Sequence, residues 1–172
     1  RLSTARGVAL VAAAKARGLA LTCDVGMHHL HLCDRDVGDF NANMRLVPPL
    51  RDQRDRDALR GALADGTIDA VCSDHSPVDD DAKQVPFGEA EPGATGLELF
   101  LPLVLKWGAE MKLPLAATLA AATSRPSAVL GIDAGTLGPG RAADLCLFDP
   151  QRHWVVTPAV LASQGRNSPF LG

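Results

Sequence analysis

The stretch Ile68-Asp69-Ala70-Val71-Cys72-Ser73-Asp74-His75-Ser76-Pro77 decides the fold class. Its first six residues are mostly apolar, which is typical of a strand that is buried on both faces in a parallel sheet. The strand then ends on a carboxylate and an imidazole, and α/β barrels keep their catalytic groups at such strand ends. Asp74 is therefore a candidate for binding a metal or accepting a proton, with capping of the following turn as the alternative.

The segments before this strand alternate between helix and strand. A helix is expected over 52–64, and a second apolar strand over 19–25 precedes it. Another helix is expected over 4–17, with Ser3 or Thr4 as its cap. Strands that alternate with helices predict parallel βα units.

The segments after it continue the pattern and then change. Three further helices are expected, over 96–108, 114–123 and 124–130. From residue 131 onward, glycines separate short apolar segments, which predicts a small all-β appendage with strands over 144–148 and 154–157. Only two parallel strands are visible, whereas a (β/α)₈ barrel takes about 250 residues. We therefore expect residues 1–130 to be the C-terminal part of a barrel and residues 131–172 to belong to a composite β-sandwich.

The composition excludes several classes of function. Among the 172 residues, 17 Lys and Arg stand against 20 Asp and Glu, and the net charge of -3 gives no electrostatic reason to expect nucleic acid or an anionic membrane as partner. No apolar run reaches the roughly 18 residues of a membrane span. Four cysteines lie in apolar, strand-like segments and predict buried free thiols of a reducing cytoplasm: Cys23, Cys33, Cys72 and Cys146.

A second candidate site is the segment His28-His29-Leu30-His31-Leu32-Cys33. If this segment is extended, His29, His31 and Cys33 share one face, and imidazole and thiolate are zinc ligands. Three ligands at this spacing on one strand diverge, however. The alternative is a loop whose histidines make structural hydrogen bonds.

Weaker candidates lie in the loops. Arg45 and Arg51 are each placed to clamp a substrate carboxylate or, alternatively, to form an exposed ion pair. Phe87 and Gly88 lie in a loop where backbone amides are able to approach a ligand, although glycine is common in loops.

Together these segments resemble the C-terminal half of a dihydroorotase, of the amidohydrolase superfamily. The matching motifs are Leu2-Ser3-Thr4, Thr22-Cys23-Asp24-Val25, His28-His29-Leu30, Pro48-Pro49-Leu50-Arg51, Asp65-Gly66-Thr67-Ile68-Asp69, Ser73-Asp74-His75-Ser76-Pro77, Pro86-Phe87-Gly88, Gly96-Leu97-Glu98, Gly140-Arg141-Ala142-Ala143-Asp144-Leu145 and Gly165-Arg166-Asn167-Ser168-Pro169-Phe170. The resemblance implies a zinc-dependent TIM-like barrel that interconverts N-carbamoyl-aspartate and dihydroorotate in pyrimidine synthesis. It also implies that Asp74 binds metal and moves a proton, and that the backbone of Phe87 and Gly88 contacts the substrate.

Three positions depart from the motifs of that family. The metal-binding His that precedes the Ser-Thr element is Arg1 here, and a guanidinium has no lone pair for a metal. The substrate-binding Asn before Pro-Pro-Leu-Arg is Val47, and the His that closes the Asp-His-x-Pro-His motif is Val78. Losing groups that act as a unit lowers turnover by several orders of magnitude.

This pattern is similar to that of inactive dihydroorotase-like chains, which assemble with aspartate carbamoyltransferase. The leading hypothesis is therefore a catalytically defective homologue with a structural role in an oligomer. One alternative is an active zinc-dependent dihydroorotase with an altered site. Another is an inactive homologue that still binds an anionic pyrimidine precursor through Arg1, Arg45 or Arg51.

Overall fold

A short parallel sheet lies at the centre of the computed structural model, which describes residues 1–171. Strand β1 (Asp24–Gly26) pairs in parallel with β2 (Ala70–Cys72). On the other side of β1, Leu2 makes a single parallel bridge to Val25. The predicted parallel arrangement is therefore confirmed, with three parallel segments side by side.

Both strands are shorter than the predicted ranges 19–25 and 68–73. The ladder consists of three paired positions, with Asp24 opposite Ala70 at one end and Gly26 opposite Cys72 at the other. A strand extends only as far as its partner does, and residues 19–22 have no ladder partner in the described chain.

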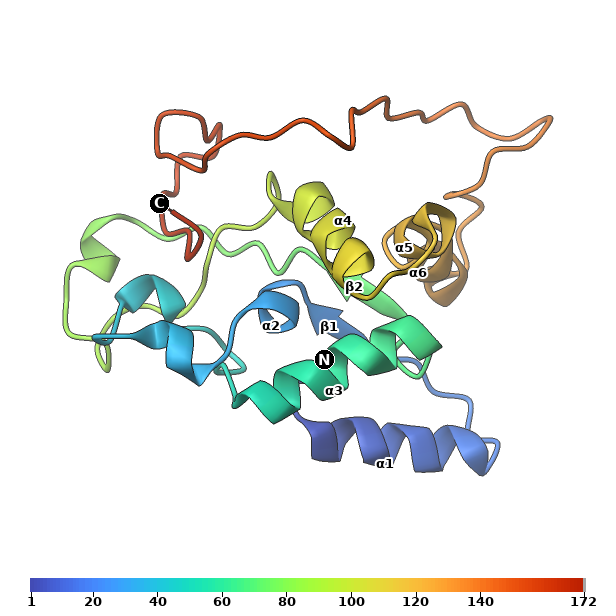
Figure 1. Cartoon of the computed structure of the whole chain (residues 1–172), viewed down its shortest axis with the longest axis horizontal. Helices are drawn as coiled ribbons and strands as arrows, with labels where there is room; N and C mark the ends of the chain where they lie inside the picture. Colours follow the sequence, from blue (N-terminus) through green and yellow to red (C-terminus); the bar gives the residue numbers. More distant parts are fainter. Residues whose placement is uncertain (172) are drawn as a thin grey trace.

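Two helices begin and end where their local sequence predicts. Helix α1 (Ala5–Ala16) is capped by the hydroxyl of Thr4, and α3 (Gln53–Asp65) by the carboxylate of Asp52. Gly66 ends α3 in the left-handed conformation, with φ of +87°. The two helices lie side by side under the sheet (Figure 1).

The later helices are close to their predicted ranges. Helix α4 (Phe100–Glu110) begins four residues later than predicted, and α5 (Leu115–Ala120) is shorter at both ends. Helix α6 (Ser124–Leu130) has the predicted bounds, but its N-cap is Thr123 rather than Ser124.

The long segment 26–50 is not wholly irregular. It contains the single helical turn α2 (His28–His31) and the 3₁₀ turns Asp34–Val37 and Ala42–Met44. A third 3₁₀ turn, Asp81–Lys83, lies in the loop 79–94.

The main core lies between the sheet and the helices. Val25 and Val71 pack in one buried cluster with Leu63 of α3 and with Val104 and Trp107 of α4. This cluster covers only one face of the sheet, so the opposite face is available for polar side chains.

The tail after α6 forms no strand within the described residues, so the predicted strands over 144–148 and 154–157 are wrong for this structure. It runs in extended form from α6 across the molecule toward the C-terminus (Figure 1). Leu147 and Cys146 are exposed there, which corrects the prediction that all four thiols are buried; Cys33 is buried, and Cys23 and Cys72 are partly so. The division at residue 131 stays a prediction.

All four cysteines are free thiols, as predicted. Across residues 1–171, none of the helices has the length and apolar character needed to cross a bilayer.

Candidate functional site

One face of the sheet carries charged and polar residues. Successive strand residues point to opposite faces, so Asp24, Gly26 and Cys72 face away from the core that holds Val25 and Val71. We call the group Arg1, Asp24, Gly26, Cys72 and Asp74 the charged face.

Asp74 lies at the carboxyl end of β2, as predicted. It follows the strand by two residues and has φ of +50°, an uncommon conformation for a residue with a side chain. Its carboxylate lies over Gly26: a Cβ atom at that glycine would be 2.9 Å from Asp74 Oδ2. Glycine on β1 therefore makes room for the carboxylate that β2 supplies.

Arg1 pairs with two carboxylates of the charged face. Its Nη1 donates to Asp74 Oδ1, and its Nη2 donates to Asp24 Oδ2 at 3.3 Å. Burial raises the pKa of Asp24, but the Arg1 guanidinium, the neighbouring Cys72 side chain and the amino group of Arg1 together outweigh burial and hold this pKa below its ordinary value. Burial also raises the pKa of the Cys72 thiol to about 12, so this thiol is protonated and a poor ligand or nucleophile.

The segment His28–His31 is helical, so His29, His31 and Cys33 do not share the extended face that the candidate zinc site required. His29 Nε2 donates to the Pro48 carbonyl at 3.0 Å, and His31 Nε2 donates to the Leu103 carbonyl at 2.9 Å. A carbonyl only accepts, so each of these nitrogens carries the proton. The alternative of structural hydrogen bonds is confirmed for both residues.

His75 follows Asp74 and supports the neighbouring turn. Its Nδ1 accepts from the backbone N–H of Gly96 at 3.1 Å and of Leu97 at 3.2 Å. This nitrogen is therefore engaged by the chain itself. Within residues 1–171, His, Cys, Asp and Glu side chains form no group of three that is placed to hold a metal ion.

The loop candidates are only partly brought together. Phe87 packs on a small second cluster around Met44 and stacks at a tilt on Phe40, with ring centroids 5.9 Å apart. Gly88 has open space where a Cβ would be. The structure does not test their predicted contact with substrate.

The other loop candidates lie at the surface or bond to the chain. Val47 and Arg51 are exposed, and the backbone carbonyl of Arg45 accepts from Gly93 N–H at 2.8 Å. The N–H of Val78 donates to Asn167 Oδ1 at 3.2 Å.

Asn167 and Lys83, which the sequence does not single out as candidates, hold the loops near the charged face together. The Asn167 amide donates to the carbonyls of Ser76 at 2.9 Å and Gly93 at 3.2 Å, and its oxygen accepts from Val78. Lys83 Nζ donates to three backbone carbonyls, those of Ala42, Glu91 and Gly93. Asn167 belongs to the tail motif Gly165–Phe170, and this motif is the sequence feature that could have indicated its importance.

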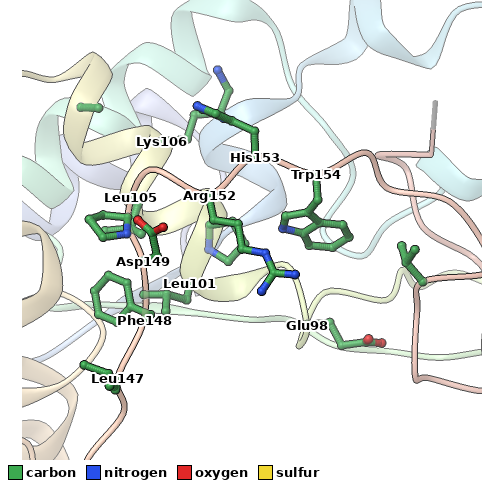
Figure 2. Close-up of a pocket in the computed structure, with 14 residues that line it drawn as sticks. Glu98, Leu101, Leu105, Lys106, Leu147, Phe148, Asp149, Arg152, His153 and Trp154 are labelled. Atoms are coloured by element: carbon green, nitrogen blue, oxygen red, sulfur yellow. The ribbon is translucent and has the colours of Figure 1, made fainter.

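A separate groove of about 1090 Å³ lies between α4 and the tail. Leu101 and Leu105 of α4 line it together with Phe148 and Trp154 of the tail (Figure 2). None of the residues of the charged face lines this groove.

The parallel strands, the helices packed against one face and Asp74 at the carboxyl end of β2 together define part of an α/β barrel. Residues 8–169 match the amidohydrolase family. The chain belongs to this family.

Similar proteins carry related names. A "Dihydroorotase" of Geotalea daltonii is 43% identical over 171 residues, which are 99% of this chain and 40% of that protein. A "Dihydroorotase-like protein" of Pseudomonas aeruginosa is 44% identical over 172 residues, 100% of this chain and 40% of that protein. The chain thus spans about 40% of the length of these curated relatives.

Solved structures agree on the fold. The L-hydantoinase (dihydropyrimidinase) of Arthrobacter aurescens has a TM-score of 0.91 and 29% identity, over 100% of this chain and 40% of that one. A D-hydantoinase has a TM-score of 0.88 and 28% identity, with the same coverage. The predicted partial amidohydrolase barrel is therefore confirmed.

Proposed function

We propose that this chain is part of a cytoplasmic dihydroorotase-like protein of pyrimidine synthesis that lacks ordinary turnover and serves as a structural partner of aspartate carbamoyltransferase. The pairing of the Arg1 guanidinium with the Asp74 carboxylate carries the proposal. A carboxylate paired with a permanent cation is a poor metal ligand and a poor proton acceptor. The name of the Pseudomonas relative, "Dihydroorotase-like protein", supports the family part of the proposal.

The side chains of this site do not fit the metal ion that amidohydrolases generally use. The Arg1 side chain lies against the carboxylate that the resemblance assigns to metal, and a guanidinium repels a divalent cation. The neighbouring Cys72 is held as the neutral thiol. We therefore assign no step of a reaction to a metal in this chain.

Turnover assays on the full-length protein that contains this chain test the first half of the proposal. We expect no measurable interconversion of dihydroorotate and N-carbamoyl-aspartate, with or without added zinc. A turnover number near the usual enzyme median of about 10 per second would contradict it. Arg1→His, Val47→Asn and Val78→His, combined in the same protein, test whether these three positions are the whole defect.

Association with aspartate carbamoyltransferase tests the second half. We expect the full-length protein to co-elute with the transferase of the same organism in size-exclusion chromatography with light scattering. Separate elution, with transferase activity unchanged by mixing, would remove the structural role.

An active zinc-dependent dihydroorotase is the second candidate function. The 43% identity to the Geotalea dihydroorotase favours it, as does the position of Asp74 at the strand end. Zinc-dependent turnover in the assay above would establish this candidate in place of the first.

A further inference from the structure

We propose that Arg1 is a built-in cation that joins Asp24 and Asp74 and so braces the charged face without a metal ion. This inference rests on the proposed function, because a working metal site would need the Asp74 carboxylate for itself. It goes further by giving the substituted residue a positive role in the folded protein.

The first support is the placement of the three residues. Arg1 precedes Leu2, which bridges to β1; Asp24 begins β1; and Asp74 follows β2. One guanidinium therefore contacts carboxylates from two strands while its own backbone belongs to the third parallel segment. Its planar, multi-donor head suits this task better than the point charge of lysine.

The second support is the cost of leaving the carboxylates unpaired. The Asp74 side chain is 14% exposed and that of Asp24 is 34% exposed, so water screens them incompletely. Without a cation, two like charges on one face repel each other, and burial penalises both. Asp74 is in addition held at φ of +50°, a conformation that needs support from its surroundings.

The third support is that the room between the strands is shaped for this pair. Gly26 lets the Asp74 carboxylate approach β1, since a Cβ there would lie 2.9 Å from Asp74 Oδ2. The arrangement therefore depends on the close approach of the Asp74 carboxylate to the backbone of β1 as well as on its ion pair with Arg1.

Thermal unfolding of the full-length protein, with EDTA or with stoichiometric zinc chloride, tests the brace. We expect the wild type to have the same Tm in both solutions. We expect Arg1→Gln to lower Tm by about 3 °C or more in EDTA and to recover part of the loss with zinc, because a cation then relieves the two carboxylates. Arg6→Gln, at an exposed position of α1, is the matched control and leaves Tm unchanged.

A double-mutant cycle with Asp74→Asn isolates the interaction. We expect Arg1→Gln/Asp74→Asn to be more stable than the sum of the single losses predicts, because the double variant leaves no unpaired carboxylate at residue 74. If Arg1→Gln does not fold, the cycle is run with Asp24→Asn and Asp74→Asn, which share the guanidinium; a non-additive loss supports the brace.

The outcomes separate this inference from the proposed function. An unchanged Tm for Arg1→Gln, or additive losses in the cycle, would overturn the brace while the turnover assay still decides the function. A wild type that zinc stabilises and activates would overturn both.

Discussion

Burial favours the neutral form of three neighbouring histidines. His28, His29 and His31 each donate a ring proton to a backbone carbonyl, and burial lowers the pKa of all three. For His31 the pKa falls to about 4. A charged imidazole at any of these positions would lose hydration that the protein does not replace.

We therefore predict that stability falls as the pH drops from about 6.5 to about 4. In this window the unfolded chain binds more protons at these histidines than the folded chain does, so the free energy of unfolding decreases as pH falls. His31 alone contributes up to about 3 kcal/mol of this change. Urea unfolding at a series of pH values measures it.

His31→Gln tests the assignment to this residue. The variant removes one titrating group, so the slope of stability against pH becomes shallower between these limits. His153→Gln, at an exposed position in the tail, is the matched control. Equal slopes for wild type and His31→Gln would contradict the prediction.

For single residues, the sequence predicts the place in a strand or helix better than it predicts the hydrogen-bond partner. Asp74 is a candidate from the sequence because it directly follows an apolar strand, and this feature is local. The partners of His29 and His31, Pro48 and Leu103, lie 19 and 72 residues away in the chain, so no short sequence window contains them. The pairing of Arg1 with Asp74 spans 73 residues and was equally invisible.

Helices α4 and α5 approach each other closely at one glycine. A Cβ atom at Gly108 would lie 2.1 Å from Thr118 Oγ1 and 2.7 Å from Thr118 Cβ. Thr118 is itself buried, and its hydroxyl group donates a hydrogen bond to the carbonyl of Pro114. The crossing of these helices therefore depends on the absence of a side chain at residue 108.

We predict that Gly108→Ala destabilises the protein by about 1–3 kcal/mol, because the helices must separate to admit the methyl group. Thr118→Ala in the same chain restores part of the loss. Gly61→Ala is a sharp control: Gly61 lies within α3 and has no atom within 4 Å of its Cβ position, so this change stabilises by about 0.5–1 kcal/mol. Denaturant unfolding of the wild type, the two single glycine variants and the double variant measures these free energies of unfolding. Equal changes in the free energy of unfolding for Gly108→Ala and Gly61→Ala would contradict the packing argument.

Elements with local start and stop signals were predicted closely, and the others were not. Thr4 and Asp52 cap α1 and α3 through neighbouring backbone groups, which a short sequence window contains. The apolar segments of the tail have a strand-like composition, but a strand also requires a partner, and none pairs with them here. Composition alone therefore overpredicted the tail strands.

At the scale of the whole molecule, much apolar surface is uncovered. The tail exposes Leu137, Leu145, Leu147 and Val155, and the two-stranded sheet is covered by the main core on one face only. Parallel sheets are normally covered on both faces. The chain spans about 40% of the length of the hydantoinase structures that it matches.

We predict that residues 1–172 expressed alone do not form a stable monomer, because exposed apolar segments and the unpaired edges of a short sheet are templates for association. Size-exclusion chromatography with light scattering should give heterogeneous, self-associated material, and heating should give a broad transition. The full-length protein, run in parallel, is the control and should elute as a defined species with a cooperative transition. A monodisperse species of 18.0 kDa that unfolds cooperatively would show instead that the described core, from Leu2 to Phe170, is sufficient to hold the fold.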